Sequence, residues 1–411
     1  MKKPGSFKAA VTGLGVVSAA GIDAKSTWYS AVTGKVGHIS RPASLAGLPH
    51  DFAYTVPDDF HPDDLLGRAR SRQMDRFSHL AVAATCEALA DALLDPTEWD
   101  ATRVAVIIGS AHGGMTVYDA QAAVLAEKGE RGVSPMLTPL ALLNAAAASV
   151  CQYFGARGPS MGLANACASG TAAIGYGRML LQAGLADIVI AGGADSMQAR
   201  PLFASCIRAR AMSLRSHEPH TAVRPFDADR DGMVSGEGSG ILVLERPEHA
   251  RARGARIRAV ISGFGASSDA HSPAAPDPHG TGIELALRNA LADAGIAPSG
   301  IDHVNAHGTS TVANDAIEGA MLHRVLGDRP YITSTKPITG HTLGAAGAIE
   351  TALTVLALEE QTVPPTANLQ HQDPRLPLKF TRSALSTPLD HAAKVSLGFG
   401  GHNAALILCR A

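Results

Sequence analysis

Short runs of apolar residues, each bounded by glycine, are the most regular feature along this chain. A strand that is buried on both faces carries apolar side chains at successive positions, so these runs predict strands inside a layered fold. Longer stretches with helical spacing lie between several of them, which is typical of the α/β class. The predicted strands span 8–13, 104–109, 188–193, 240–245, 258–263, 301–306, 331–334, 394–397 and 404–409, and the predicted helices span 77–94, 171–183, 283–294, 315–326 and 344–358.

Two parts of the chain have a weakly similar sequence pattern. Glycine-rich segments at 236–238 and 398–401 each follow an irregular loop and precede an apolar run. This weak similarity indicates a duplicated α/β unit, which divides the chain into predicted halves 1–255 and 256–411. Because no linker or low-complexity tract separates these halves, we expect them to pack into one body.

Composition narrows the class of protein. Hydrophobic residues make up 46% of the 411 residues and charged residues 18%, which favours a large core and an oligomer. The net charge of -2, without a block of lysine and arginine, gives no electrostatic footprint for nucleic acid. No apolar stretch reaches about 18 residues, so we expect no membrane span. Five widely spaced cysteines without a CxxC pair favour reduced thiols and a cytoplasmic location.

Cys167 is the first candidate for chemistry. It lies among small residues just before the helix predicted from Thr171, where free backbone N–H groups and the helix dipole favour a thiolate. Small neighbours also leave room for an acyl group. The alternative is a buried structural cysteine, since free cysteine often belongs to a core. The other four cysteines lie in ordinary apolar contexts, so the structural interpretation is preferred for them.

Two histidines follow predicted strands in the second half of the chain. His307 has a glycine behind it and three hydroxyl residues after it, which is typical of a polar pocket floor. His341 opens a helix of small residues, five positions after Lys336. A lysine buried beside such a helix needs a charged partner, and Glu350 is the predicted one. Taken singly, each histidine also fits an ordinary loop position.

The order Cys, His, His at successive strand–helix junctions is more specific than any one of these residues. Gly398-Phe399-Gly400-Gly401 adds a segment whose backbone N–H groups can face a site, although a hairpin with a β-bulge has the same composition. No metal-ligand spacing of cysteine and histidine appears, so no metal site is predicted. Acyl transfer to a thiol, assisted by two imidazoles, is the chemistry that uses these parts.

Seven segments in order identify a family resemblance. In them the chain is similar, nearly end to end, to the elongating class of β-ketoacyl-acyl-carrier-protein synthases of the thiolase superfamily. The resemblance implies a thiolase-like duplicated five-layer αβαβα sandwich, usually a homodimer. The nucleophile would lie in half 1–255, and the two histidines and the gating loop in half 256–411. The segments are VTGLGVVSAAG, NACASGTAAIGYGRMLLQAG, DIVIAGGADSM, RPFDADRDGMVSGEGSGILVLE, NAHGTSTVANDAIE, STKPITGHTLGAAGAIE and GFGGHN.

The resemblance also implies a role for each matched residue. Cys167 would be the acylated nucleophile, His307 and His341 would assist decarboxylation, and Lys336 would organise charge around them. Phe399 would gate the site, and its backbone N–H, with that of Cys167, would form an oxyanion hole. The remaining matches are Thr309 and Thr311, which would bind a phosphopantetheine arm, and Glu318, Glu350, Gly400 and Gly401, which would support the site.

The implied reaction is a decarboxylative Claisen condensation of acyl-Cys167 with malonyl-acyl-carrier protein, which elongates a fatty acid. Acyl carrier protein is the implied partner and brings the phosphopantetheine arm, so no resident cofactor is expected. Some relatives hold a monovalent cation near the positions of Asn305, Glu350 and Ser396.

Departures from the commonest family pattern concern gates and pocket walls. They occur at Val312, Pro337 and His402 and in the loop 267–273, and they leave the acyl chain and the pathway open. The first alternative is therefore the ketosynthase subunit of a type II polyketide or polyene synthase, paired with a chain-length factor. A thioester hydrolase and a non-catalytic scaffold are two further alternatives, and Cys167 argues against the scaffold.

Overall fold

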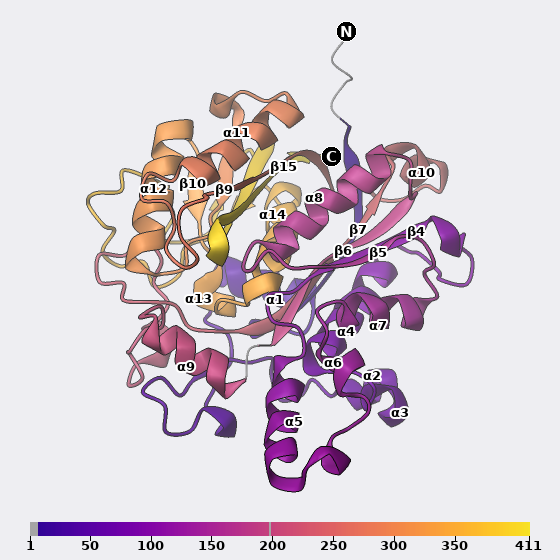
Figure 1. Cartoon of the computed structure of the whole chain (residues 1–411). Helices are drawn as coiled ribbons and strands as arrows, with labels where there is room; N and C mark the ends of the chain where they lie inside the picture. The colour runs from indigo at the N-terminus through magenta and orange to yellow at the C-terminus, as the bar shows by residue number, and fades with distance from the viewer. Residues whose placement is uncertain (1–6, 197–198) are drawn as a thin grey trace.

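The apolar runs form the strands of one mixed sheet (Figure 1). The computed structural model describes residues 7–196 and 199–411. In the sheet the strand order is β12-β10-β9-β14-β15-β8-β1-β7-β6-β4-β5. The strands are β1 (Ala9–Ser18), β4 (Val104–Gly109), β5 (Ser160–Leu163), β6 (Ile188–Ser196), β7 (Glu237–Glu245), β8 (Ala259–Ser268), β9 (His303–Asn305), β10 (Tyr331–Thr333), β12 (Lys379–Phe380), β14 (His391–Gly398) and β15 (His402–Arg410).

The two halves of this sheet, one on each side of the β1–β8 pair, have the same topology. The first half of the sheet has the strand order β5-β4-β6-β7-β1, and the second half has the equivalent order β10-β9-β14-β15-β8. β7 and β15 each run antiparallel to both neighbours, whereas the pairs toward the outer ends, β5-β4, β4-β6, β10-β9 and β9-β14, are parallel. The two halves of the sheet meet where β1 pairs with β8 over three residues. The predicted division at residue 255 lies in the segment between α10 (Pro247–Ala252) and β8.

Three layers of helices flank the two halves of the sheet, as Figure 1 shows. One outer layer packs on β1, β6 and β7, and the other packs on β8 and β15. A central layer lies between the two halves of the sheet and contacts both. The predicted five-layer αβαβα sandwich is therefore confirmed. Its helices are α4 (Arg76–Asp91) and α7 (Ala145–Phe154) in one outer layer, α8 (Ser169–Gln182) and α14 (Ala346–Glu359) in the centre, and α11 (Thr281–Ala294) and α12 (Val312–Leu326) in the other outer layer.

Small residues let the two central helices approach closely. A Cβ at Gly347 of α14 would lie 2.0 Å from Thr171 Oγ1 of α8, so only glycine fits there. Every residue of α14 from Ala346 to Leu358 is buried, because both halves of the sheet cover the helix. This explains why the helix lacks an amphipathic pattern, and it places Glu350 deep inside the protein.

Several elements lie outside the prediction. β5 is an edge strand whose residues are exposed or half-buried, so it lacks an apolar run. The unpredicted helix α5 (Met115–Lys128) has no buried residue and lies apart from the sandwich (Figure 1). β1 continues past its predicted end at residue 13, since Gly13 and Gly15 allow α4 to pack on the strand. Among the described residues, no helix combines the length and apolar character needed to cross a membrane.

Candidate active site

Cys167 lies in a tight turn between β5 and α8. Ala166 before it has a φ of +48°, and the Ser169 hydroxyl donates to the Ala166 carbonyl at 2.6 Å, so the turn is held at both ends. The cysteine is buried, with 9% of its surface exposed. Burial raises the pKa of Cys167 to about 12, and the nearby charge of Lys336 lowers it only in part. The resting group is therefore a thiol, and the predicted thiolate is wrong because desolvation outweighs the helix dipole.

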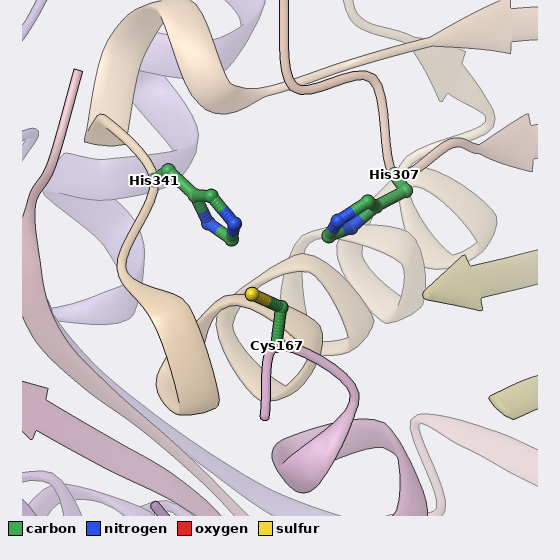
Figure 2. A group of neighbouring side chains, drawn as sticks. All are labelled: Cys167, His307 and His341. Carbon is green, nitrogen blue, oxygen red and sulfur yellow. The ribbon is translucent and has the colours of Figure 1, made fainter. Parts of the chain in front are cut away.

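The two histidines come from different elements and meet over the sulfur. His307 follows β9, and His341 lies just after the short helix α13 (Lys336–Thr339). Figure 2 shows the Cys167 sulfur directed between the two rings. The ring centroids are 5.3 Å apart and nearly perpendicular, and the ligand-type atoms of the three residues lie within 4.8 Å of one another. The structure thus brings together the three residues that the sequence places up to 174 positions apart.

Both imidazoles are neutral N–H donors. Burial, and then the charge of Lys336, lower the pKa of His307 and the pKa of His341 well below the usual 6.5. The Leu343 backbone N–H donates to His341 Nδ1 at 3.3 Å, so the single ring proton lies on Nε2. Lys336 Nζ lies 3.5 Å from His307 Nδ1 and favours the same tautomer there. Two Nε2–H groups are therefore available to developing negative charge.

Lys336 and two buried carboxylates hold the His307 segment. Lys336 Nζ donates to the His307 carbonyl and, at 2.5 Å, to Glu350 Oε1, so the predicted partner of this lysine is correct. The Glu318 carboxylate accepts the backbone N–H groups of His307 at 2.6 Å and Gly308 at 2.7 Å. Burial raises the pKa of Glu318 to about 7. These contacts fix the backbone that carries the His307 ring.

Two buried ionisable residues that contact the elements around this site escaped the sequence prediction. Asp195, near the end of β6, accepts the backbone N–H groups of Ala111 and Gly344, each at 2.7 Å, and so connects the loop after β4 to the segment after His341. Lys394 of β14 pairs with Glu350 at 2.7 Å. The available signal for Lys394 was a single lysine inside an otherwise apolar strand.

The Gly-Phe-Gly-Gly segment touches the nucleophile turn. Phe399 is 47% exposed, and its backbone N–H donates toward the Cys167 sulfur. Gly400 and Gly401 have φ values of +81° and +76°, which favour glycine. A Cβ on Gly398 would lie 2.6 Å from the Asn165 carbonyl oxygen, although the backbone there is extended. Glycine at 398 thus allows the contact that places the Phe399 N–H.

We expect Gly398→Ala to slow acylation of Cys167 by up to about a hundredfold, because the added methyl displaces an N–H donor from the reacting centre. The rate of acyl-enzyme formation measures the effect. Gly47→Ala is the control, since Gly47 has a φ of +79° and no atom within 4 Å of the added Cβ, so it introduces strain away from the cavity. Equal rates for the two variants would contradict the prediction.

A cavity of about 490 Å³ opens above Cys167, His307 and His341, a size that suits a small ligand. Thr309 and Thr311 line it, and their hydroxyls lie 2.9 Å apart. Other lining residues are mostly apolar, among them Cys206, Met233, Leu343 and Phe399.

The cation that some relatives hold does not fit the residues of this chain. Lys394 Nζ lies at the expected position, 2.7 Å from Glu350 Oε2 and 3.4 Å from the Asn305 carbonyl oxygen. Ser396 Oγ is already hydrogen-bonded to Thr171 Oγ1 at 2.8 Å. A lysine ammonium thus lies among the oxygen atoms that a monovalent ion would need.

A five-layer sandwich with a cysteine between two histidines defines a thiolase-like condensing enzyme. The sequence pattern described as "Beta-ketoacyl synthase, N-terminal domain" matches residues 7–250, and "Beta-ketoacyl synthase, C-terminal domain" matches residues 258–370. The chain therefore belongs to the β-ketoacyl synthase family.

Relatives and solved structures agree with this assignment. The chain is 40% identical over 402 residues to a 3-oxoacyl-(acyl-carrier-protein) synthase 2 of Synechocystis sp., with 96% of each chain covered. It superposes on a β-ketoacyl synthase from Burkholderia phymatum with a TM-score of 0.92 and 34% identity, covering 98% of this chain and 100% of that one. For the ishigamide ketosynthase/chain length factor, the values are 0.92 and 32%, with 99% and 100% covered.

Proposed function

We propose that this protein condenses an acyl group carried on Cys167 with malonyl-acyl-carrier protein and so elongates a fatty acid. The observation that carries the proposal is a buried thiol between two neutral imidazoles that each present an N–H group. The 40% identity to relatives named 3-oxoacyl-(acyl-carrier-protein) synthase 2 supports this substrate class.

The first step transfers the acyl chain. The Cys167 sulfur attacks the thioester carbonyl of acyl-carrier protein, and the N–H groups of Phe399 and Cys167 stabilise the oxyanion. The bond from carbonyl carbon to the carrier thiol breaks, and the proton lost by Cys167 ends on that departing thiol. Thr309 and Thr311, at the cavity wall, bind the phosphopantetheine arm of the carrier.

The second step forms the carbon–carbon bond. The malonyl carboxylate leaves as CO2, and the enolate oxygen accepts hydrogen bonds from His307 and His341. The enolate carbon then attacks the acyl-Cys167 thioester. The sulfur departs as a thiolate and takes a proton from solvent, which its pKa of about 12 favours, and β-ketoacyl-carrier protein is released.

The alternative role in a type II polyketide or polyene synthase has a structural observation in its favour. The similar solved structures include one described as a type II PKS acyl-carrier protein in complex with its ketosynthase bound to the hexaketide, with 30% identity and a TM-score of 0.88. The identities of 38–40% to relatives named 3-oxoacyl-(acyl-carrier-protein) synthase 2 favour fatty-acid elongation over the polyketide role.

Intact-protein mass spectrometry tests the proposal. We expect the purified protein to gain the mass of one acyl group when it meets a saturated acyl-carrier protein, and to release β-ketoacyl-carrier protein after malonyl-carrier protein is added. Free acid release without malonyl substrate would instead identify a thioester hydrolase. Activity that requires a Cys-lacking homologue would favour the polyketide role.

A further inference from the structure

Two fully buried lysines share one carboxylate beneath the site. Lys336 Nζ lies 2.5 Å from one oxygen of Glu350, and Lys394 Nζ lies 2.7 Å from the other. Both lysine side chains are 0% exposed and that of Glu350 is 1% exposed. A buried ammonium is retained only when a negative charge and carbonyl oxygens replace its water. The role assigned above to Lys336 leaves Lys394 without an explanation.

Lys394 projects from the middle of the sheet toward the central helices. It lies in β14, opposite Asn305 of β9 and Leu406 of β15. Side chains alternate along a strand, so Lys394 and Ser396 share one face, and Ser396 contacts Thr171 of the central helix α8. The Lys394 ammonium is therefore held between β14, β9 and α14.

Backbone carbonyl oxygens complete the surroundings of this ammonium. Lys394 Nζ donates to the Val395 carbonyl, and the Asn305 and Ala306 carbonyls each lie 3.4 Å away. Together with Glu350 they form a small cage of oxygen atoms. Proteins use such carbonyl oxygens to replace the hydration shell of potassium. The cage would therefore suit a monovalent cation if the lysine were absent.

We propose that the Lys394 ammonium is a built-in cation that replaces a bound monovalent ion in this enzyme. Charge supports the assignment. Lys336 and Lys394 share the single carboxylate of Glu350, so an added metal ion would increase an excess of positive charge that is already buried there.

The same ammonium ties together the two segments that carry the chemistry. The carbonyls of Asn305 and Ala306 immediately precede His307, and Val395 lies three residues before Gly398 and four before Phe399. Lys394 contacts neither the cavity nor Cys167, since it is absent from the cavity wall. It is thus a positioning residue, which holds the His307 segment in register with the Phe399 segment.

The unmodified protein provides the first test. Thermal unfolding and malonyl decarboxylation are measured in potassium, sodium or tetramethylammonium chloride at one ionic strength. The proposal expects the same Tm and the same rate in all three salts, since the cage is already filled. A saturable increase of either quantity with potassium or sodium would overturn it. The Tm comparison does not depend on the proposed reaction, so failure of that reaction is distinguishable from failure of this inference.

Two variants provide the second test. Lys394→Ala opens the cage, whereas Lys394→Met keeps most of the side-chain volume in an apolar, uncharged form. Potassium or ammonium should raise the Tm of Lys394→Ala by about 2–4 °C in a saturable way and restore part of its decarboxylation rate, because the ion occupies the vacated cage. Lys394→Met should not respond. If both variants fold and respond alike, the inference is wrong. If neither folds, the salt comparison on the unmodified protein decides.

Discussion

Replacement of Cys167 by alanine is expected to remove the acyl-enzyme and to lower the condensation rate by at least about a thousandfold. The reason is direct: Cys167 is the thiol that lies between the His307 and His341 rings, and the condensation needs a covalent thioester to attack (Figure 2). The measurement is the intact mass after incubation with acyl-carrier protein, followed by the rate of β-ketoacyl product formation.

Cys206→Ala is the matched control. Cys206 lines the same cavity as Cys167, is half-buried, and lacks the two imidazoles. Burial raises its pKa, as it does for Cys167, so burial alone does not distinguish the two thiols. The Cys206→Ala protein should still gain the mass of one acyl group. Condensation by Cys167→Ala, or loss of the acyl mass in Cys206→Ala, would show that the nucleophile has been assigned to the wrong residue.

The strands of the sandwich were predictable because burial on both faces leaves a mark in the sequence. β4 begins at Val104 and ends at Gly109, as predicted, since it has neighbours on both sides and helices on both faces. β5 was not predicted, because an edge strand at 160–163 need not be apolar. Helix α5 failed for a related reason: with no buried residue, it has no apolar stripe to detect.

The grouping of Cys167 with His307 and His341 was predictable from residue types and order, but the electrostatics of these residues were not. Position at a helix start predicts a thiolate, whereas the pKa of Cys167 depends on how completely the surrounding layers remove water. Contacts across the fold have the same character. Lys394 and Glu350 are 44 positions apart, and only the packing of β14 against α14 shows that they form an ion pair.

Glu350 shows how the two lysines and the reaction centre depend on one another. Lys336 connects Glu350 to the His307 carbonyl, while Lys394 connects the same carboxylate to the carbonyls of Asn305 and Ala306. The backbone just before His307 is therefore held by two ammonium groups and, through its N–H groups, by Glu318. A neutral imidazole in a fixed orientation follows from this arrangement, because positive charge lies close by and water is excluded.

His307→Ala and His341→Ala are each expected to slow malonyl decarboxylation by about 10²–10³-fold, since each removes one N–H donor from the enolate oxygen. The measurement is CO2 release from malonyl-carrier protein. Glutamine variants are the controls: a glutamine amide can place an N–H near the position of Nε2, so His307→Gln and His341→Gln should be faster than the alanine variants. Decarboxylation at the original rate in either alanine variant would contradict the assigned role.

The same two rings should stay uncharged across the physiological range. An imidazole with the ordinary pKa of about 6.5 is mostly protonated at pH 6 and mostly neutral at pH 8. Because the pKa values of His307 and His341 are lowered, the proton that an ordinary imidazole gains on acidification is not gained here until the pH falls well below 6.5. A rate profile would also contain the titration of Glu318, whose pKa is about 7. Nitrogen NMR of labelled histidine is therefore the measurement, with the two glutamine variants assigning the signals. Both rings should show the neutral Nε2–H tautomer from pH 6 to pH 8, and an imidazolium signal from either ring at pH 6 would refute the neutral-donor mechanism.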